Sequence, residues 1–136
     1  MTISEKQAAL VDEFAFFDDW MDKYNHIIEM GKSLKAMSEG DKDDELLVQG
    51  CQSKVWLKAE KQDNTVRFWA DADAIIAKGI VAMLIDVFDG QPAADIANAE
   101  LNFIEEIGLK DHLSPTRANG LMSMIKQMKI YALAFS

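Results

Sequence analysis

The stretch that decides the fold class spans residues 54–88 and reads KVWLKAEKQDNTVRFWADADAIIAKGIVAMLIDVF. Its first part alternates apolar and polar residues twice, at 54–59 and at 65–70, with turn-forming residues at 62–64. Alternation with a period of two is typical of a strand with one buried face, so the two runs predict a β-hairpin. The second part, residues 74–88, places apolar side chains at helical spacing and predicts an apolar helix under this sheet.

Two features inside this stretch leave a structural question open. A change of one residue in the turn would move Trp56 and Trp69 between the same face and opposite faces, so the sequence does not specify the register. We expect at least one of the two indoles to cover the non-core side of the sheet. Gly79 interrupts the helix at a cost of about 1 kcal/mol relative to alanine, which predicts a close approach by another element, with a strand as the expected neighbour.

Helical patterns precede the hairpin. Ser4 and Gln7 resemble a capping box at the start of a first helix over residues 4–17. The acidic pair at 18–19 is expected to cap a second helix, and Gly31 to end it in a left-handed conformation.

The segments that flank the hairpin and its helix differ in character. Residues 37–45 are acidic with little to bury and predict a solvated loop, whereas 46–48 predict a short edge strand. Short helices are expected at 92–98 and 100–107. A Ser-Pro pair at 114–115 then begins a long final helix, because serine is a good cap and proline suits the first helical position.

Length and charge limit the class of protein. A chain of 136 residues with 49% hydrophobic composition suits one compact domain, which we place over residues 1–136. The net charge is −9, and no basic run is interleaved with aromatic residues. We therefore expect neither a nucleic acid nor an anionic membrane as a partner.

The sequence also predicts a cellular location. The first seven residues have neither the apolar core of a signal peptide nor an Arg-rich transit pattern. The longest apolar stretch, residues 80–88, is interrupted by Asp86 and falls far short of the ~20 residues that span a bilayer. A location in the reducing cytoplasm is the simplest expectation.

Cys51 is the only cysteine in the chain. One sulfur cannot close an intrachain disulfide, and one cysteine with two distant histidines lacks the spacing of a metal or iron-sulfur site. Its neighbours Gly50, Gln52 and Ser53 are small or polar and would make a poor core wall. We therefore interpret Cys51 as an accessible nucleophile on a turn rather than as core filling.

Three separated motifs resemble one family. They are GCQSKVWL at 50–57, DADA at 71–74 with KG at 78–79, and HLSPTRANGL at 112–121. Together they are similar to the SufE family of cysteine-desulfurase sulfur acceptors, over nearly the whole chain. One departure is Ala72, where the family usually has serine, so a hydroxyl hydrogen bond is missing there.

The resemblance implies a fold and a reaction. The fold would be α+β, with a small antiparallel sheet of about three strands packed against several helices, as in NifU-like, IscU-type scaffolds. A SufS-like cysteine desulfurase, which carries the pyridoxal phosphate, would hold sulfur as a persulfide; Cys51 would accept it and pass it to an iron-sulfur scaffold. The chain itself would need no cofactor or metal, and would act as an accessory sulfur carrier rather than a stand-alone enzyme.

The same resemblance implies supporting or partner-docking residues around the thiol. These residues are Gly50, Gln52, Ser53, Asp73 and Arg117. For Arg117 the simpler interpretation is a surface residue paired with an acid, whereas the resemblance implies a positive charge that stabilises the thiolate or docks the desulfurase. Asp73 is equally expected as the cap of the helix that starts at residue 74.

Two other functions remain open at this stage. In the first, the chain is a thiol redox enzyme that uses Cys51, although its sequence has no resolving cysteine and no Cys-x-x-Cys motif. In the second, the chain is a noncatalytic interaction module that binds its partner through the acidic stretch at 37–45, and Cys51 has no role.

Overall fold

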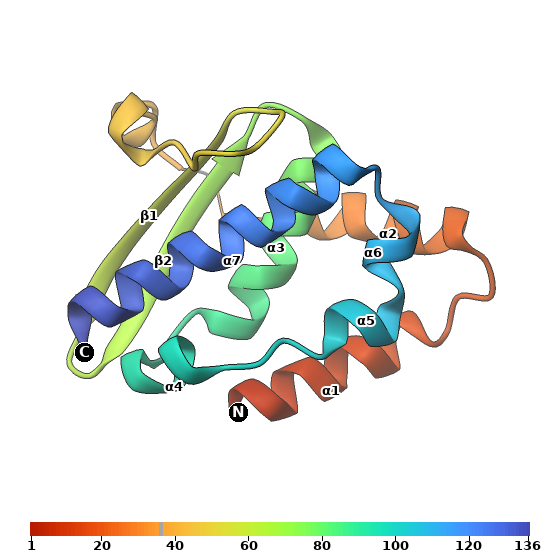
Figure 1. Cartoon of the computed structure of the whole chain (residues 1–136), viewed down its shortest axis with the longest axis horizontal. Coiled ribbons are helices and arrows are strands. Elements are labelled where there is room, and N and C mark those ends of the chain that lie inside the picture. The colour runs from red at the N-terminus through yellow and green to blue at the C-terminus, as the bar shows by residue number, and fades with distance from the viewer. Residues whose placement is uncertain (36) are drawn as a thin grey trace.

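The computed structural model describes residues 1–35 and 37–136, and its architecture is α+β, as predicted (Figure 1). One antiparallel sheet has the order β1-β2-β3, with strands β1 (Val55–Gln62), β2 (Thr65–Ala72) and β3 (Gln91–Pro92). The helices are α1 (Ile3–Phe14), α2 (Trp20–Lys32), α3 (Ile75–Phe88), α4 (Ala93–Asn98), α5 (Phe103–Ile107), α6 (Leu109–His112) and α7 (Pro115–Phe135). Two 3-10 turns, η1 (Glu39–Asp41) and η2 (Asp44–Leu46), precede β1. Within the described ranges, none of the helices combines the length and the apolar character that crossing a membrane requires.

The predicted hairpin is present, and its turn fixes the register that the sequence left open. Two residues, Asp63 and Asn64, separate the paired strands, and Asp63 takes a positive φ of 56°. Trp56 then pairs with Asp71, and Trp69 pairs with Lys58. Cross-strand partners share a face, so both indoles lie on the non-core side of the sheet.

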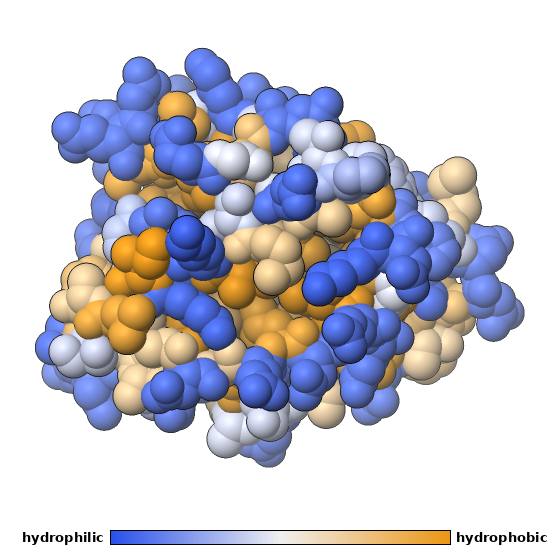
Figure 2. All heavy atoms as spheres, viewed as in Figure 1, coloured by the Kyte–Doolittle hydropathy of each residue, from blue (hydrophilic) through white to orange (hydrophobic). Residues whose placement is uncertain are grey.

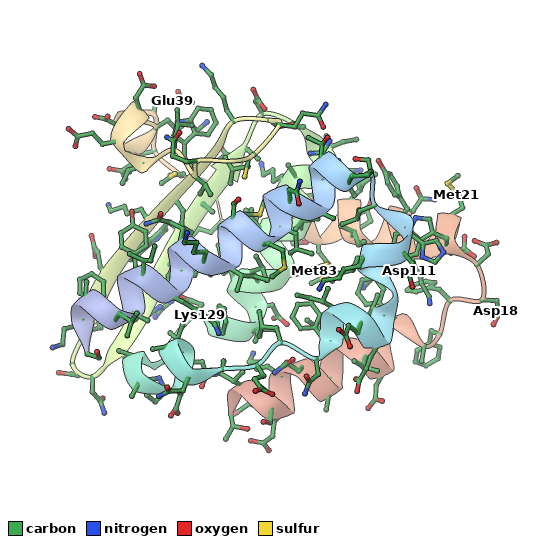
Figure 3. All side chains as sticks on the ribbon, in the orientation of Figure 1. Asp18, Met21, Glu39, Met83, Asp111 and Lys129 are labelled. Atoms are coloured by element: carbon green, nitrogen blue, oxygen red, sulfur yellow. The ribbon has the colours of Figure 1, made fainter. Side chains whose placement is uncertain are left out.

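The other face of the hairpin forms the core with α3. Alternate residues along the strands are buried, and α3 packs against β2 as expected. Leu84, Val87 and Phe88 of α3 are fully buried. Figure 3 shows Met83 among the side chains that fill the space between the ribbons of α3, α5 and α7.

The close approach predicted at Gly79 is real, but its neighbour is a helix and not a strand. A Cβ on Gly79 would lie 2.2 Å from the carbonyl oxygen of Ile27 in α2. The same contact explains Gly31, which was expected to end α2 in a left-handed conformation. Gly31 instead lies inside α2, where a Cβ would be 2.7 Å from the backbone nitrogen of Gly79. The two glycines let the axes of α2 and α3 come together.

The first helix starts earlier than predicted because a better capping box precedes it. The side chain of Thr2 accepts from the backbone nitrogen of Glu5, and Glu5 accepts in return from Thr2. The proposed Ser4–Gln7 box is therefore wrong. Gln7 is buried, donates to the carbonyl of Glu100 and accepts from the backbone nitrogen of Phe103, which ties α1 to α5.

The segment between α2 and β1 is mostly exposed, as predicted, but it contains short helical turns. Residues 37–46 contain the two 3-10 turns, and Met37 is buried; residue 36 lies outside the described residues. The predicted edge strand at 46–48 is reduced to a single bridge between Leu47 and Trp56. The third strand of the sheet is instead β3, which pairs with the start of β2.

In the C-terminal part, the predicted start of the long final helix is confirmed. Ser114 caps α7 by accepting from the backbone nitrogen of Arg117, and proline occupies the first turn. The helix expected over 100–107 begins only at Phe103, and α6 was not predicted. Gly108 separates α5 from α6 with a left-handed φ of 90°.

Replacing Gly79 by alanine tests the contact between α2 and α3. Because the new methyl would meet the backbone of Ile27, the two helices must separate, and overpacking outweighs the gain in helix propensity. We expect the free energy of unfolding, measured by urea denaturation, to fall by about 2 kcal/mol or more. Gly40→Ala is the control, since no described heavy atom lies within 4 Å of its Cβ position. Equal stability of the two variants would contradict this account.

A candidate sulfur site around Cys51

Cys51 lies in the loop that joins η2 to β1, with its side chain half-buried. The Sγ atom donates a hydrogen bond to the carbonyl oxygen of Gly120 in α7, at a distance of 3.6 Å. Figure 1 shows this loop, in yellow, near the N-terminal end of α7. The thiol is thus held between a turn and a helix that lies 69 residues further along the chain.

Three hydrogen bonds close the base of the Cys51 loop. On one side the backbone nitrogen of Val48 donates to the carbonyl of Val55 at 2.8 Å. On the other side Asp73 and Lys54 are joined twice. The Asp73 carboxylate accepts from the Lys54 nitrogen, and the Asp73 nitrogen donates to the Lys54 carbonyl, each at 3.0 Å. Residues 49–53 therefore project from a fixed base.

These bonds correct the predicted role of Asp73. The N-cap of α3 is Ala74, whose side chain has no capping group, and α3 starts at Ile75. Asp73 instead anchors the strand that leads away from Cys51. At the neighbouring position, where the family usually has serine, the backbone nitrogen of Ala72 donates to Asp71 Oδ1 at 2.8 Å.

Gly50 is required by the way the loop meets α7. Its φ is +91°, and a Cβ at this position would lie 2.6 Å from Oγ of Ser123. Any larger residue would be strained in its backbone, and its Cβ would force the Ser123 hydroxyl to turn away. Gly50 therefore lets the loop adopt this turn directly before Cys51, with its backbone close to the Ser123 side chain.

Arg117 is brought to the site by the start of α7. Its Nη1 atom donates to Oγ of Ser53 at 3.4 Å, so the residue that follows Gln52 in the loop holds the guanidinium. Gln52 itself is exposed. The structure thus places Gly50, Ser53 and Arg117 around the thiol, with Gln52 facing outward.

Two opposing effects act on the thiol. Burial raises the pKa of Cys51 above that of an ordinary cysteine, and the positive charge of Arg117 opposes this rise without cancelling it. The resting thiol is therefore protonated at neutral pH and weakly nucleophilic. Arg117 thus lowers the pKa of Cys51, which is the predicted direction, but the rise caused by burial is larger.

The hollow at Cys51 is small compared with others on the surface. Residues 47–54 line a cavity of about 180 Å³ at the thiol. A cavity of about 340 Å³ lies between α7 and the α4–α5 segment, lined by Leu101, Ile104, Met122 and Ile125 among others. Figure 2 shows apolar side chains in this region with charged ones around them, and Figure 3 shows Lys129 reaching from α7 across it.

The histidines have packing contacts of their own. His26 lies against the rings of Phe14 and Phe17, at centroid distances of 5.0 and 5.1 Å. His112 stacks on Trp20 at 4.3 Å. In the part of the chain that the structure describes, no group of three His, Cys, Asp or Glu side chains could hold a metal ion.

Comparison with known proteins identifies the family of this chain. Residues 8–132 match the family model of SufE, described as an Fe-S metabolism associated domain. The chain belongs to the SufE family. Membership supports a role in Fe-S metabolism.

SufE-like proteins of two bacteria are similar to this chain. An uncharacterized SufE-like protein of Rhizobium meliloti (strain 1021) is 42% identical over 125 residues, covering 88% of this chain and 89% of that protein. One from Synechocystis sp. (strain ATCC 27184 / PCC 6803 / Kazusa) is 36% identical over 134 residues, covering 98% of this chain and 84% of that protein. In structure, the chain is similar to a hypothetical protein from Thermus thermophilus whose structure was solved in solution. The TM-score is 0.79, with 16% identity and coverage of 96% and 95% of the two chains.

Two residues of this SufE-family site escaped the sequence analysis as separate candidates. Gly120 accepts the thiol hydrogen bond, and Ser123 lies against Gly50. Their spacing from Arg117 could have identified them. Arg117, Gly120 and Ser123 follow one another at intervals of three, which places them along one side of a helix.

Replacing Arg117 by alanine tests the electrostatics of this site. With the opposing positive charge removed, the midpoint of the Cys51 alkylation rate against pH should move further upward. Arg117→Lys keeps the charge and should shift the midpoint less. The fold should lose at most ~1 kcal/mol, because the helix cap uses the backbone nitrogen of residue 117 and not its side chain. An unchanged or lowered midpoint in the alanine variant would show that Arg117 does not act on the thiol.

Proposed function

We propose that this chain accepts persulfide sulfur from a cysteine desulfurase on Cys51, stimulates that enzyme, and delivers the sulfur for iron-sulfur cluster assembly. The observation that carries the proposal is the setting of the chain's only cysteine, which is half-buried against α7 beside Arg117 in a SufE-family fold. The donor is a SufS-like desulfurase that carries the pyridoxal phosphate, and the recipient is an iron-sulfur scaffold. The setting of this exchange is the cytoplasm.

The transfer is an exchange between a thiolate and a persulfide. The Cys51 thiolate attacks the outer sulfur of the persulfide on the desulfurase. A bond forms between Cys51 Sγ and that sulfur, the sulfur-sulfur bond on the desulfurase breaks, and the desulfurase cysteine leaves as a thiolate. The step consumes no oxidant, and this chain contributes no cofactor to it.

The raised pKa of Cys51 has a function in this scheme. A protonated, half-buried thiol reacts slowly with oxidants and disulfides, so the resting carrier is protected. Docking of the desulfurase has to favour the thiolate, and Arg117 is the cation already placed to balance its charge. The same charge stabilises the persulfide anion after transfer.

The remaining site residues have positioning roles in the proposal. Gly50 lets the loop lie against α7, Ser53 holds Arg117, and Asp73 fixes the base of the loop through Lys54. Gln52 is exposed beside the thiol and is available to the desulfurase. The absence of a second cysteine from the sequence also fits a carrier, because a neighbouring thiol would resolve the persulfide into a disulfide.

Cys51→Ser tests the proposal in a desulfurase turnover assay. The hydroxyl nearly matches the thiol in size but has far too high a pKa to attack a persulfide, so stimulation of cysteine turnover should be abolished. The thermal midpoint should stay near that of the wild type. Cys51→Ala is run beside it, and both variants should still bind the desulfurase. Stimulation equal to wild type in either variant would show that Cys51 is not the acceptor.

A further inference from the structure

The acidic stretch that precedes the Cys51 loop lies against the outer face of the hairpin. Residues 39–46, here called the strap, contain the turns η1 and η2. Figure 3 shows Glu39 of the strap at the outer side of β1. The strap carries five acidic residues and one base, Lys42, and the hairpin face beneath it contains Asp71, which is 9% exposed. Acidic groups on both sides of this contact would repel each other.

Lys42 replaces this repulsion by an attraction. Its Nζ atom lies 2.9 Å from Oδ2 of Asp71 and 5.7 Å from the centroid of the Trp56 ring, so one side chain binds the strap to both long strands. Since the Asp71 carboxylate is largely shielded from water, its attraction to Lys42 is screened less than that of an exposed pair. A second, more exposed attachment joins Asp41 of the strap to Lys58 of β1 at 3.2 Å.

The strap leads directly into one side of the base of the Cys51 loop. Leu47, the first residue after the strap, makes a single β-bridge with Trp56. The backbone nitrogen of Val48 then donates to the carbonyl of Val55. A pairing as short as this has little stability of its own. This side of the base therefore depends on the strap staying on the hairpin.

We propose that Lys42 is a positioning residue for Cys51: by holding the strap on the hairpin, it limits how often the Cys51 loop opens and fully exposes its thiol. The value of this control for sulfur exchange rests on the proposed function, whereas the contact itself acts in the reduced chain without a partner. Without the Lys42 charge, the strap would present only acidic groups to Asp71 and would leave the hairpin more often. Lys78 of α3 would still pair with Asp71 at 3.4 Å, so the buried carboxylate keeps a cation and the hairpin stays folded.

The test compares amide hydrogen exchange at the two sides of the loop base in the reduced, isotope-labelled chain. The Val48 amide reports the side next to the strap, and the Asp73 amide, which donates to the Lys54 carbonyl, reports the other side. Lys42→Met removes the charge and keeps most of the length of the side chain. Lys32→Met is the matched control, because Lys32 also pairs with a glutamate three positions earlier, but on the exposed surface of α2.

Lys42→Met should raise the exchange rate of the Val48 amide about tenfold relative to that of the Asp73 amide. The alkylation rate of Cys51 is divided by the thiolate fraction, taken from the midpoint of each variant's own pH profile, so that it reports access to the sulfur. This corrected rate should also rise in Lys42→Met. Lys32→Met should match wild type in both measurements, and Lys42→Arg should restore most of the wild-type behaviour because it keeps the charge.

Three results would overturn the role of Lys42. One is a Val48 amide that exchanges as slowly in Lys42→Met as in wild type. Another is a rise shared equally by the Val48 and Asp73 amides, since the variant would then only be less stable overall. The third is an unchanged corrected alkylation rate of Cys51.

The two proposals fail separately, because exchange and alkylation need no desulfurase. If Val48 and Cys51 respond as expected but a desulfurase donates no sulfur, the role of Lys42 stands and the proposed function is wrong. If a desulfurase loads the chain but Lys42→Met leaves Val48 and Cys51 unchanged, the proposed function stands and the role of Lys42 is wrong.

Discussion

The contact between the Cys51 loop and α7 is the constraint on which the site depends. Gly50 brings the loop backbone against Ser123, Cys51 lies over Gly120, and Ser53 holds Arg117. A reactive sulfur that must be both protected and reachable needs a wall on one side and solvent on the other. The helix supplies the wall, and the half-buried loop leaves the thiol accessible.

The rest of the fold holds the two sides of this contact in place. On the outer face of the hairpin, Lys42 and Lys78 pair with Asp71, at 2.9 and 3.4 Å. Burial alone would raise the pKa of Asp71, but the hydrogen bond from Lys42, the bond from the Ala72 nitrogen and the nearby lysine charges lower it below its ordinary value. This cluster joins the 3-10 segment, β2 and α3 next to the base of the Cys51 loop. Beneath the sheet, the glycine contact between α2 and α3 sets the position of the core helix.

The sequence predicted those features whose signals are local. The alternating runs around residues 62–64, the apolar pattern of α3 and the Ser114 cap are all confirmed. Those that depend on partners far along the chain were missed or wrong. Gly31 was expected to end a helix but packs on Gly79, and Asp73 was expected to cap α3 but binds Lys54. In the site, the motif letters singled out Cys51 and Arg117, whereas the contact between the thiol and the Gly120 carbonyl emerged only in the structure.

The central claim is that Cys51 carries sulfur received from a desulfurase. The most direct measurement incubates a desulfurase with cysteine labelled at sulfur, adds this chain, separates the two proteins and records the intact mass and label of each. The account predicts that this chain gains the mass of one or more sulfur atoms and the label at Cys51, and that a reducing thiol removes both. Label that remains on the desulfurase alone, with this chain at its unmodified mass, would contradict the account.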